Sequence, residues 1–147
     1  MLVMKHASKI YPGGAAALQD VNVHIKPGEF VFLVGPSGAG KSTFIKTISR
    51  EIELSSGQIF VDGVDVMKLR NDEIPYLRRQ LGIVFQDYQL LTDRNVFMNL
   101  YYVMKATGWK REQEIRERID RVLGLVELGS KSYKMPFELS GGEQQRL

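Results

Sequence analysis

The most constraining feature of this 147-residue chain is an eight-residue segment that runs from Gly35 to Ser42. Its sequence, Gly-Pro-Ser-Gly-Ala-Gly-Lys-Ser, has the pattern G-x-x-x-x-G-K-[ST] of a phosphate-binding loop. Backbone N–H groups surround a polyphosphate only where no side chain blocks its approach, and Gly35, Gly38 and Gly40 leave that room. A helix beginning at Lys41 would direct the positive end of its dipole toward the anion. The segment predicts a loop that binds a nucleoside triphosphate.

Each polar residue of the loop has a chemical task in this prediction. We expect Lys41 to reach the β- and γ-phosphates, Ser42 to place its hydroxyl on Mg²⁺, and Thr43 to contact an α-phosphate oxygen. The alternative is a flexible Gly/Ser turn that contains a lysine by chance. The apolar run Phe30–Val34 before the loop and the helical pattern after it disfavour that alternative. The expected ATP-binding residues are Gly35, Pro36, Ser37, Gly38, Ala39, Gly40, Lys41, Ser42 and Thr43.

The first part of the chain has a mixed α/β pattern. Strands are predicted over Leu2–Ala7 and Gln58–Val61, and Val21, Val23 and Ile25 alternate with polar residues as in a half-buried strand. The run Phe30–Val34, apolar at every position, is typical of a strand buried on both faces of a parallel sheet, and Leu81–Phe85 is predicted to be a second, mostly apolar strand. We expect helices over 41–51, with Phe44, Ile45 and Ile48 facing inward, and over 71–80, where Pro75 limits the start.

The second part is predicted to be helical. Phe97, Leu100, Tyr101 and Met104 have the spacing of one apolar helical face, for which Asp93 is the predicted cap. Ile115, Ile119, Val122 and Val126 form a second such stripe. The outer face carries the i, i+4 pairs Glu112–Arg116, Glu114–Arg118 and Glu117–Arg121, which is typical of a solvated helix face and not of a nucleic-acid site. A loop is predicted over Gly129–Pro136.

A second glycine-containing cluster, Leu139-Ser140-Gly141-Gly142-Glu143-Gln144-Gln145-Arg146, lies near the end of the chain. By itself it predicts a helix start, with Ser140 and Glu143 as a capping box. Together with the phosphate loop, however, the chain resembles the ABC-type ATPases, because this cluster is similar to their signature motif. The resemblance implies an α/β fold: a P-loop NTPase (ABC ATPase) core with an antiparallel β part and a helical subdomain, of which we expect this chain to be a form truncated after the signature motif.

Further site residues follow from this resemblance alone. Tyr11 matches the aromatic residue that stacks on adenine, with a simple turn tyrosine as the alternative. Gln86 matches the glutamine that contacts Mg²⁺ and the attacking water, with a polar strand end as the alternative. Ser140, Gly141, Gly142 and Glu143 match residues near the γ-phosphate of ATP held by a second copy. The implied catalytic residues are Lys41 and Gln86, and the implied metal ligands are Ser42 and Gln86.

The resemblance also implies an organisation and partners. Residues 1–86 would be the β part and phosphate-loop core, and 87–147 the helical subdomain, whose region from Tyr88 to Pro136 docks on an integral membrane protein. Two copies would bind two ATP molecules head to tail. The segments Glu29–Phe44 and Leu81–Leu91 resemble the cell-division branch of the family, whose membrane partner is FtsX-like; lipoprotein-release and macrolide-type exporters share much of this pattern.

The bulk properties agree with such a protein. The chain is 44% hydrophobic and 25% charged, carries a net charge of +3, and contains no cysteine, which excludes disulfides and thiolate metal sites. No signal peptide is evident, and no apolar run reaches the ~18 residues that cross a bilayer. Any membrane role is then expected to come through a partner, and the resemblance implies a location in the cytoplasm, peripheral on the inner face of the membrane.

The family's motifs are only partly present. No apolar strand ending in Asp and Glu, which would organise Mg²⁺ and activate water, and no later histidine follow the signature cluster. We therefore expect slow or no ATP hydrolysis by this chain alone, and an uncovered face or edge at Phe30–Val34 and Leu81–Phe85. A nucleotide-binding fragment without turnover remains the alternative to an ATPase subunit. A small-molecule kinase is disfavoured because such kinases lack the Leu139–Arg146 cluster.

Overall fold

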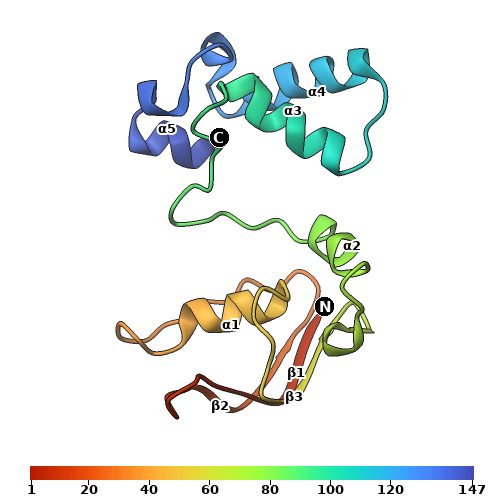
Figure 1. Ribbon diagram of the computed structural model, residues 1–147, viewed down its shortest axis with the longest axis vertical. Helices are drawn as coiled ribbons and strands as arrows, with labels where there is room; N and C mark the ends of the chain where they lie inside the picture. Colours follow the sequence, from red (N-terminus) through yellow and green to blue (C-terminus); the bar gives the residue numbers. More distant parts are fainter. The chain divides into compact units, whose positions relative to one another are not determined.

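The computed structural model describes all 147 residues, which form two compact units, Met1–Gly82 and Ile83–Leu147 (Figure 1). None of the helices is both long enough and apolar enough to cross a membrane.

The first unit is built on a four-stranded antiparallel sheet with the strand order β2-β1-β3-β4. Its strands are β1 (Leu2–Ile10), β2 (Ala16–Ile25), β3 (Ser56–Val61) and β4 (Val64–Asp65). A tight turn at Asp62 and Gly63, both with positive φ, joins β3 to β4, as the Asp-Gly pair predicts. The three predicted strands of this part are confirmed, and β1 and β2 extend beyond their predicted ends.

The helix α1 (Lys41–Ile48) packs against this sheet and completes its core. Phe44 is buried together with Met4, Leu18 and Ile59, whereas Ile45 is 43% exposed, so the prediction that Ile45 faces inward is wrong. Thr43 and Thr47 are buried on this face instead. Burial of their hydroxyl groups is tolerated because each has a hydrogen-bond partner. A 3₁₀ turn η1 (Val66–Lys68) and the short helix α2 (Ile74–Arg79), with Pro75 in its first turn, end this unit.

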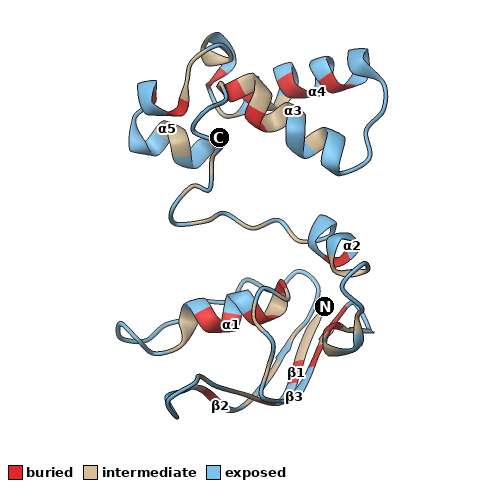
Figure 2. Ribbon diagram, viewed as in Figure 1, coloured by how far each residue is buried: buried red, intermediate tan, exposed pale blue.

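Neither the segment predicted to be a doubly buried strand nor the mostly apolar segment predicted as a further strand forms a strand here. Phe30–Val34 has no regular secondary structure and no partner strand, and its five side chains are 45% to 83% exposed. Leu81–Phe85 is also outside any strand, and Val84 is 75% exposed. The apolar composition of such runs favours burial, but a strand forms only where a neighbouring strand satisfies its N–H and C=O groups. The exposed apolar side chains expected for these segments are present at all five residues of Phe30–Val34 and at Val84. Figure 2 draws exposed stretches of the chain in pale blue.

The second unit consists of helices. Its longer helices are α3 (Val96–Ala106) and α4 (Glu112–Leu125), followed by the 3₁₀ turns η2 (Gly129–Lys131) and η3 (Pro136–Glu138) and by α5 (Gly141–Arg146). A separate core contains Val96, Ile115, Ile119, Leu123, Leu128 and Leu139. The predicted stripe residues of α3 pack against this core from partly buried positions.

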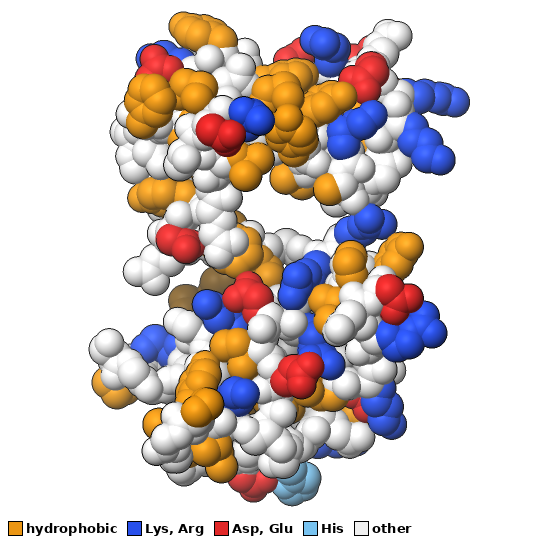
Figure 3. Space-filling view, in the orientation of Figure 1, with side chains coloured by type: hydrophobic (Ala, Val, Ile, Leu, Met, Phe, Trp, Pro, Cys, Tyr) orange, Lys and Arg blue, Asp and Glu red, His pale blue; other side chains and the backbone are white.

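Two local predictions for the helical unit are wrong. The cap of α3 is Asn95, whose side chain accepts a 2.8 Å hydrogen bond from the Met98 N–H, and not Asp93. The predicted i, i+4 ion pairs of α4 do not form. Glu112 instead contacts Lys105 at 3.0 Å, and Glu114 contacts Arg111 at 2.7 Å, because the helix start brings these cations within reach. The outer face is nevertheless solvated and of mixed charge, as expected (Figure 3).

Candidate nucleotide-binding site

The phosphate loop of the first unit has the backbone that its glycines predict. Gly38 and Gly40 have φ values of 80° and 83°, in the left-handed region that favours glycine. Gly40 is also the N-cap of α1, and a Cβ at this position would lie 2.1 Å from the Ala17 carbonyl oxygen. Only glycine therefore fits between the loop and β2 at residue 40, whereas Gly38 faces open space.

Donor groups of this loop are free to bind an anion. Neither the Gly38 N–H nor the Gly40 N–H donates to a protein acceptor, and the first N–H groups of a helix have no intrahelical acceptor. The loop from Gly35 to Ala39 is exposed, and so is the Ser42 side chain. An exposed turn with unpaired amides next to a helix start is a site that suits a phosphate chain.

The Lys41 ammonium lies over this loop. Its Nζ donates hydrogen bonds to the carbonyl oxygens of Gly35, at 2.8 Å, and Pro36, at 2.7 Å. These two bonds hold the cation at the loop's first residues, where it adds a full positive charge to the partial charges of the amides. The arrangement is thus complementary to a polyphosphate in both geometry and charge.

Tyr11 lies next to the same helix. It begins the turn between β1 and β2, which is closed by a 2.9 Å hydrogen bond from the Tyr11 N–H to the Ala15 carbonyl oxygen. The Tyr11 hydroxyl lies 3.2 Å from Thr43 Oγ1, in the first turn of α1, and the Lys9 ammonium lies 5.4 Å from the ring centroid. The structure therefore brings the predicted adenine-stacking residue and the predicted phosphate-binding residues together within one unit.

The other predicted site residues lie in the second unit. Gln86 is exposed and lies in a turn, where the Tyr88 N–H donates to the Phe85 carbonyl oxygen at 3.4 Å, so the expected strand end is not observed. Shortly after Gln86, the consecutive residues Tyr88 and Gln89 both have positive φ values, 58° and 50°. Non-glycine residues rarely adopt this conformation, and two in succession indicate a segment that its surroundings hold in place.

The Ser140 cluster forms the capping box predicted for it. Ser140 Oγ accepts from the Glu143 N–H at 3.4 Å, and the Glu143 carboxylate accepts from the Ser140 N–H at 2.9 Å. Glu143 also forms an ion pair with Lys131 of η2. The hydrogen bond from Lys131 and then that from the Ser140 backbone lower the pKa of the Glu143 carboxyl from 4.5 to about 2. The two glycines are exposed, and no atom lies within 4 Å of where a Gly142 Cβ would stand.

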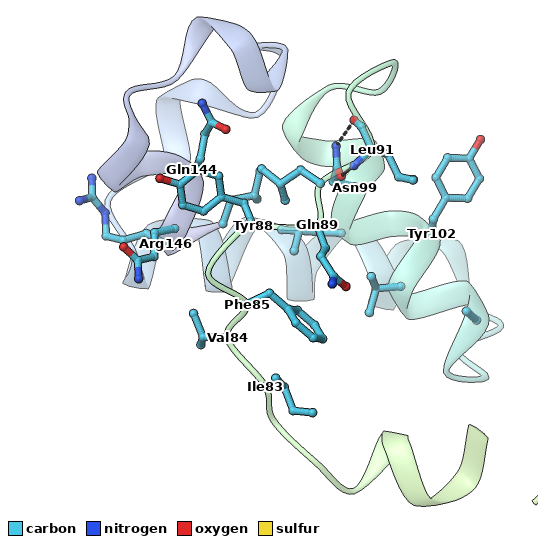
Figure 4. A pocket seen from close by; sticks show the side chains of 16 residues that line it. Ile83, Val84, Phe85, Tyr88, Gln89, Leu91, Asn99, Tyr102, Gln144 and Arg146 are labelled. Carbon is cyan, nitrogen blue, oxygen red and sulfur yellow. Dashed lines mark hydrogen bonds between the residues drawn. The ribbon is translucent and has the colours of Figure 1, made fainter. Parts of the chain in front are cut away.

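One residue that organises this unit was not predicted from the sequence. The Asn99 side chain, which is 6% exposed, makes four hydrogen bonds to the backbone of Leu91, Arg94 and Asn95. It thereby fixes the end of the segment that begins at Gln86 (Figure 4). The sequence feature that could have identified it is an asparagine within an apolar helical stripe, because a buried polar side chain normally has hydrogen-bond partners.

A glycine-rich loop that leads into the helix α1, with free amides and a lysine over it, defines the class of P-loop nucleotide-binding proteins. The sequence profile of the ABC transporter family matches residues 18–147, and the chain belongs to this family. This result confirms the expected fold class.

Curated relatives include the cell division ATP-binding protein FtsE of Bacillus subtilis (strain 168), which is 47% identical over the whole chain. The protein of the same name from Escherichia coli (strain K12) is 46% identical, and the methionine import ATP-binding protein MetN of Helicobacter hepaticus is 38% identical. The chain spans 64% of the length of the Bacillus protein and 66% of the Escherichia protein.

Solved structures agree with this assignment. The dimeric structure of MJ0796, described as a bacterial ABC transporter cassette, has a TM-score of 0.89 at 35% identity and aligns with 99% of this chain and 66% of its own. A second MJ0796 structure, described as a dimeric post-hydrolysis state bound to ADP and Pi, gives the same values. The cbiO1 protein from Clostridium perfringens has a TM-score of 0.83 at 31% identity over 99% of this chain and 57% of its own.

Proposed function

We propose that this protein is the ATP-binding subunit of an ABC-type complex and that ATP binds at the loop Gly35–Ser42. The observation that carries the proposal is the pair of free amides at Gly38 and Gly40 in a loop whose first two carbonyl groups bind the Lys41 ammonium at the start of α1. Lys41 would exchange its two carbonyl acceptors for phosphate oxygens. Thr43, already beside Tyr11, would contribute to the α-phosphate, and the Tyr11 ring would stack on adenine.

Magnesium is the metal that this donor set fits. Mg²⁺ usually takes one or two protein groups together with phosphate oxygens and water, and not a cage of protein ligands. The protein contains no cluster of three or more His, Cys, Asp or Glu side chains that would form such a cage. The Ser42 hydroxyl, exposed at the second residue of α1, would hold the ion, and Gln86 is proposed as the second protein ligand. Bound Mg²⁺ would supply neutralisation of the charge on the β- and γ-phosphates.

For the complex as a whole, we propose a head-to-tail homodimer that couples ATP binding and hydrolysis to an integral membrane partner. Ser140, Gly141 and Gly142 would contact the γ-phosphate held by the second copy. The similarity to the proteins named FtsE supports a role in cell division with an FtsX-like partner at the inner face of the membrane. The similarity to MetN keeps an import complex as the second candidate, to be separated by the membrane protein that co-purifies with the complete gene product.

The direct test of nucleotide binding is a titration with a fluorescent ATP analogue. We expect Lys41→Ala to weaken binding by roughly 100-fold or more, since a charge-assisted contact to phosphate is worth about 3 kcal/mol. Lys46→Ala is the matched control, because Lys46 lies on the same helix but pairs with Glu51 at 3.5 Å and not with the loop. Unchanged affinity in the Lys41 variant would refute the proposed site.

A further inference from the structure

The side chain of Tyr88 lies close to Gly141, although the two residues are far apart in the sequence. Its hydroxyl lies 3.1 Å from the place where a Cβ of Gly141 would stand. Tyr88 belongs to the segment that follows Gln86, and Gly141 is the first residue of α5. No protein group donates to or accepts from this hydroxyl, and it is open to solvent, since no buried side-chain oxygen is without a partner. It faces residue 141 at close range without a hydrogen bond. A larger residue than glycine at 141 would press on the tyrosine.

Both partners of this contact are held by their own surroundings. The capping box and the Lys131–Glu143 ion pair fix Ser140 and Glu143 relative to one another, so this turn moves as one piece. On the other side, the segment is bound to Asn99 at Leu91 and has left-handed backbone at Tyr88. Tyr88 and Gly141 therefore both belong to segments that hydrogen bonds or an ion pair tie to the rest of the unit.

A cavity of about 570 Å³ lies against the same two segments. Its lining includes Tyr88 and Gln89 from the segment that follows Gln86, and Gln144 and Arg146 from α5 (Figure 4). A group that entered this cavity would contact both segments, on either side of the Tyr88–Gly141 contact.

We infer that Tyr88 is a positioning residue, whose hydroxyl sets the place of the Ser140–Gly142 turn relative to the segment that follows Gln86. The inference rests on the proposed function, in which this turn contacts the γ-phosphate held by a second copy. In that setting Tyr88 makes the segment that follows Gln86 and the Ser140–Gly142 turn of the same subunit move together. It would affect the step that needs the closed dimer and leave the binding of ATP at Gly35–Ser42 unchanged.

The first test records backbone amide signals of the full chain by NMR, without nucleotide. We expect Tyr88→Phe to shift the amide signals of Ser140, Gly141 and Gly142, and Gly141→Ala to shift those of Tyr88 and Gln89. In the double variant the effect of Gly141→Ala should be smaller, because removing the hydroxyl makes room for the new methyl group. Tyr133→Phe is the control, since that side chain lies in the same unit and is 71% exposed. Additive shifts, or no shift at residues 140–142, would overturn the inference whether or not the protein hydrolyses ATP.

The second test uses the complete gene product with its membrane partner. We expect Tyr88→Phe to lower kcat for ATP hydrolysis about three- to tenfold with an unchanged KM for ATP, since the contact acts after nucleotide has bound. A change in KM alone, or an unchanged kcat, would also overturn it. A wild-type protein that binds no ATP would refute the proposed function. The NMR measurement without nucleotide would still decide whether Tyr88 positions the Ser140–Gly142 turn.

Discussion

Gly40 shows how one residue joins the loop to the sheet. Its φ of 83° is unfavourable for any side chain, and the missing Cβ is what allows the Ala17 carbonyl oxygen to approach. Gly38 has a similar φ of 80° but open space around it. The two glycines therefore separate the cost of backbone strain from the cost of a steric clash.

We predict that Gly40→Ala lowers the free energy of unfolding by about 3 kcal/mol or more, and Gly38→Ala by about 1 kcal/mol, since strained backbone alone costs roughly 1 to 3 kcal/mol. Urea unfolding of both variants, followed by circular dichroism, measures the difference. Equal losses would show that residue 40 does not lie against β2 as described.

Sequence patterns at the residue scale were informative where local chemistry decides the structure. The phosphate loop and the Ser140–Glu143 capping box needed only residues within a few positions of each other, and both were predicted. The Asn99 hydrogen bonds span 4, 5 and 8 positions, and Tyr88 and Gly141 are 53 positions apart. Both meetings depend on how the segments of this unit pack. No periodicity in a single sequence encodes such meetings.

At the scale of elements, α5 depends on a carboxylate. Glu143 accepts hydrogen bonds from Lys131 and from the Ser140 N–H, and its pKa in the folded protein is about 2. Because this pKa is lowered on folding, the stabilisation by Glu143 is complete above the ordinary value of 4.5 and is lost as the pH falls toward 2.

We predict that the stability difference between wild type and Glu143→Gln is largest above pH 5 and shrinks as the pH falls from about 4.5 to about 2. Thermal unfolding at several pH values measures it. The control is Glu117→Gln, in which the exposed residue of α4 contacts only Gln113 at 2.9 Å. A difference that does not vary with pH would contradict the role of the carboxylate charge.

Helices and strands differ in how well their sequence patterns predicted them. The stripes of α3 and α4 each identify a helix because an apolar face packs within the same unit. The run Phe30–Val34 has the composition of a central strand, yet its exposed side chains show that composition specifies hydrophobicity and not the partner strand. Strand formation needs hydrogen-bonding neighbours, which a single segment does not provide.

At the scale of the whole molecule, the proposal requires two copies. We predict that MgATP promotes dimer formation by the complete gene product and that Ser140→Arg abolishes this association while ATP affinity stays unchanged, because the larger cation blocks the turn that faces the second nucleotide. Sedimentation velocity with and without MgATP measures the association. Ser130→Arg, an exposed change in the same unit, is the control; a dimer that persists in the Ser140 variant would argue against the head-to-tail arrangement.

The central claim is that the amides and the ammonium group of residues 35–42 hold the phosphates of ATP. A titration of the isotope-labelled chain with MgATP, followed by backbone amide NMR, tests it most directly. We expect the largest shifts at Gly38, Gly40, Lys41 and Ser42, and we expect them to disappear in Lys41→Ala. Amide signals of this loop that stay unchanged at saturating MgATP, or shifts confined to other residues, would contradict it.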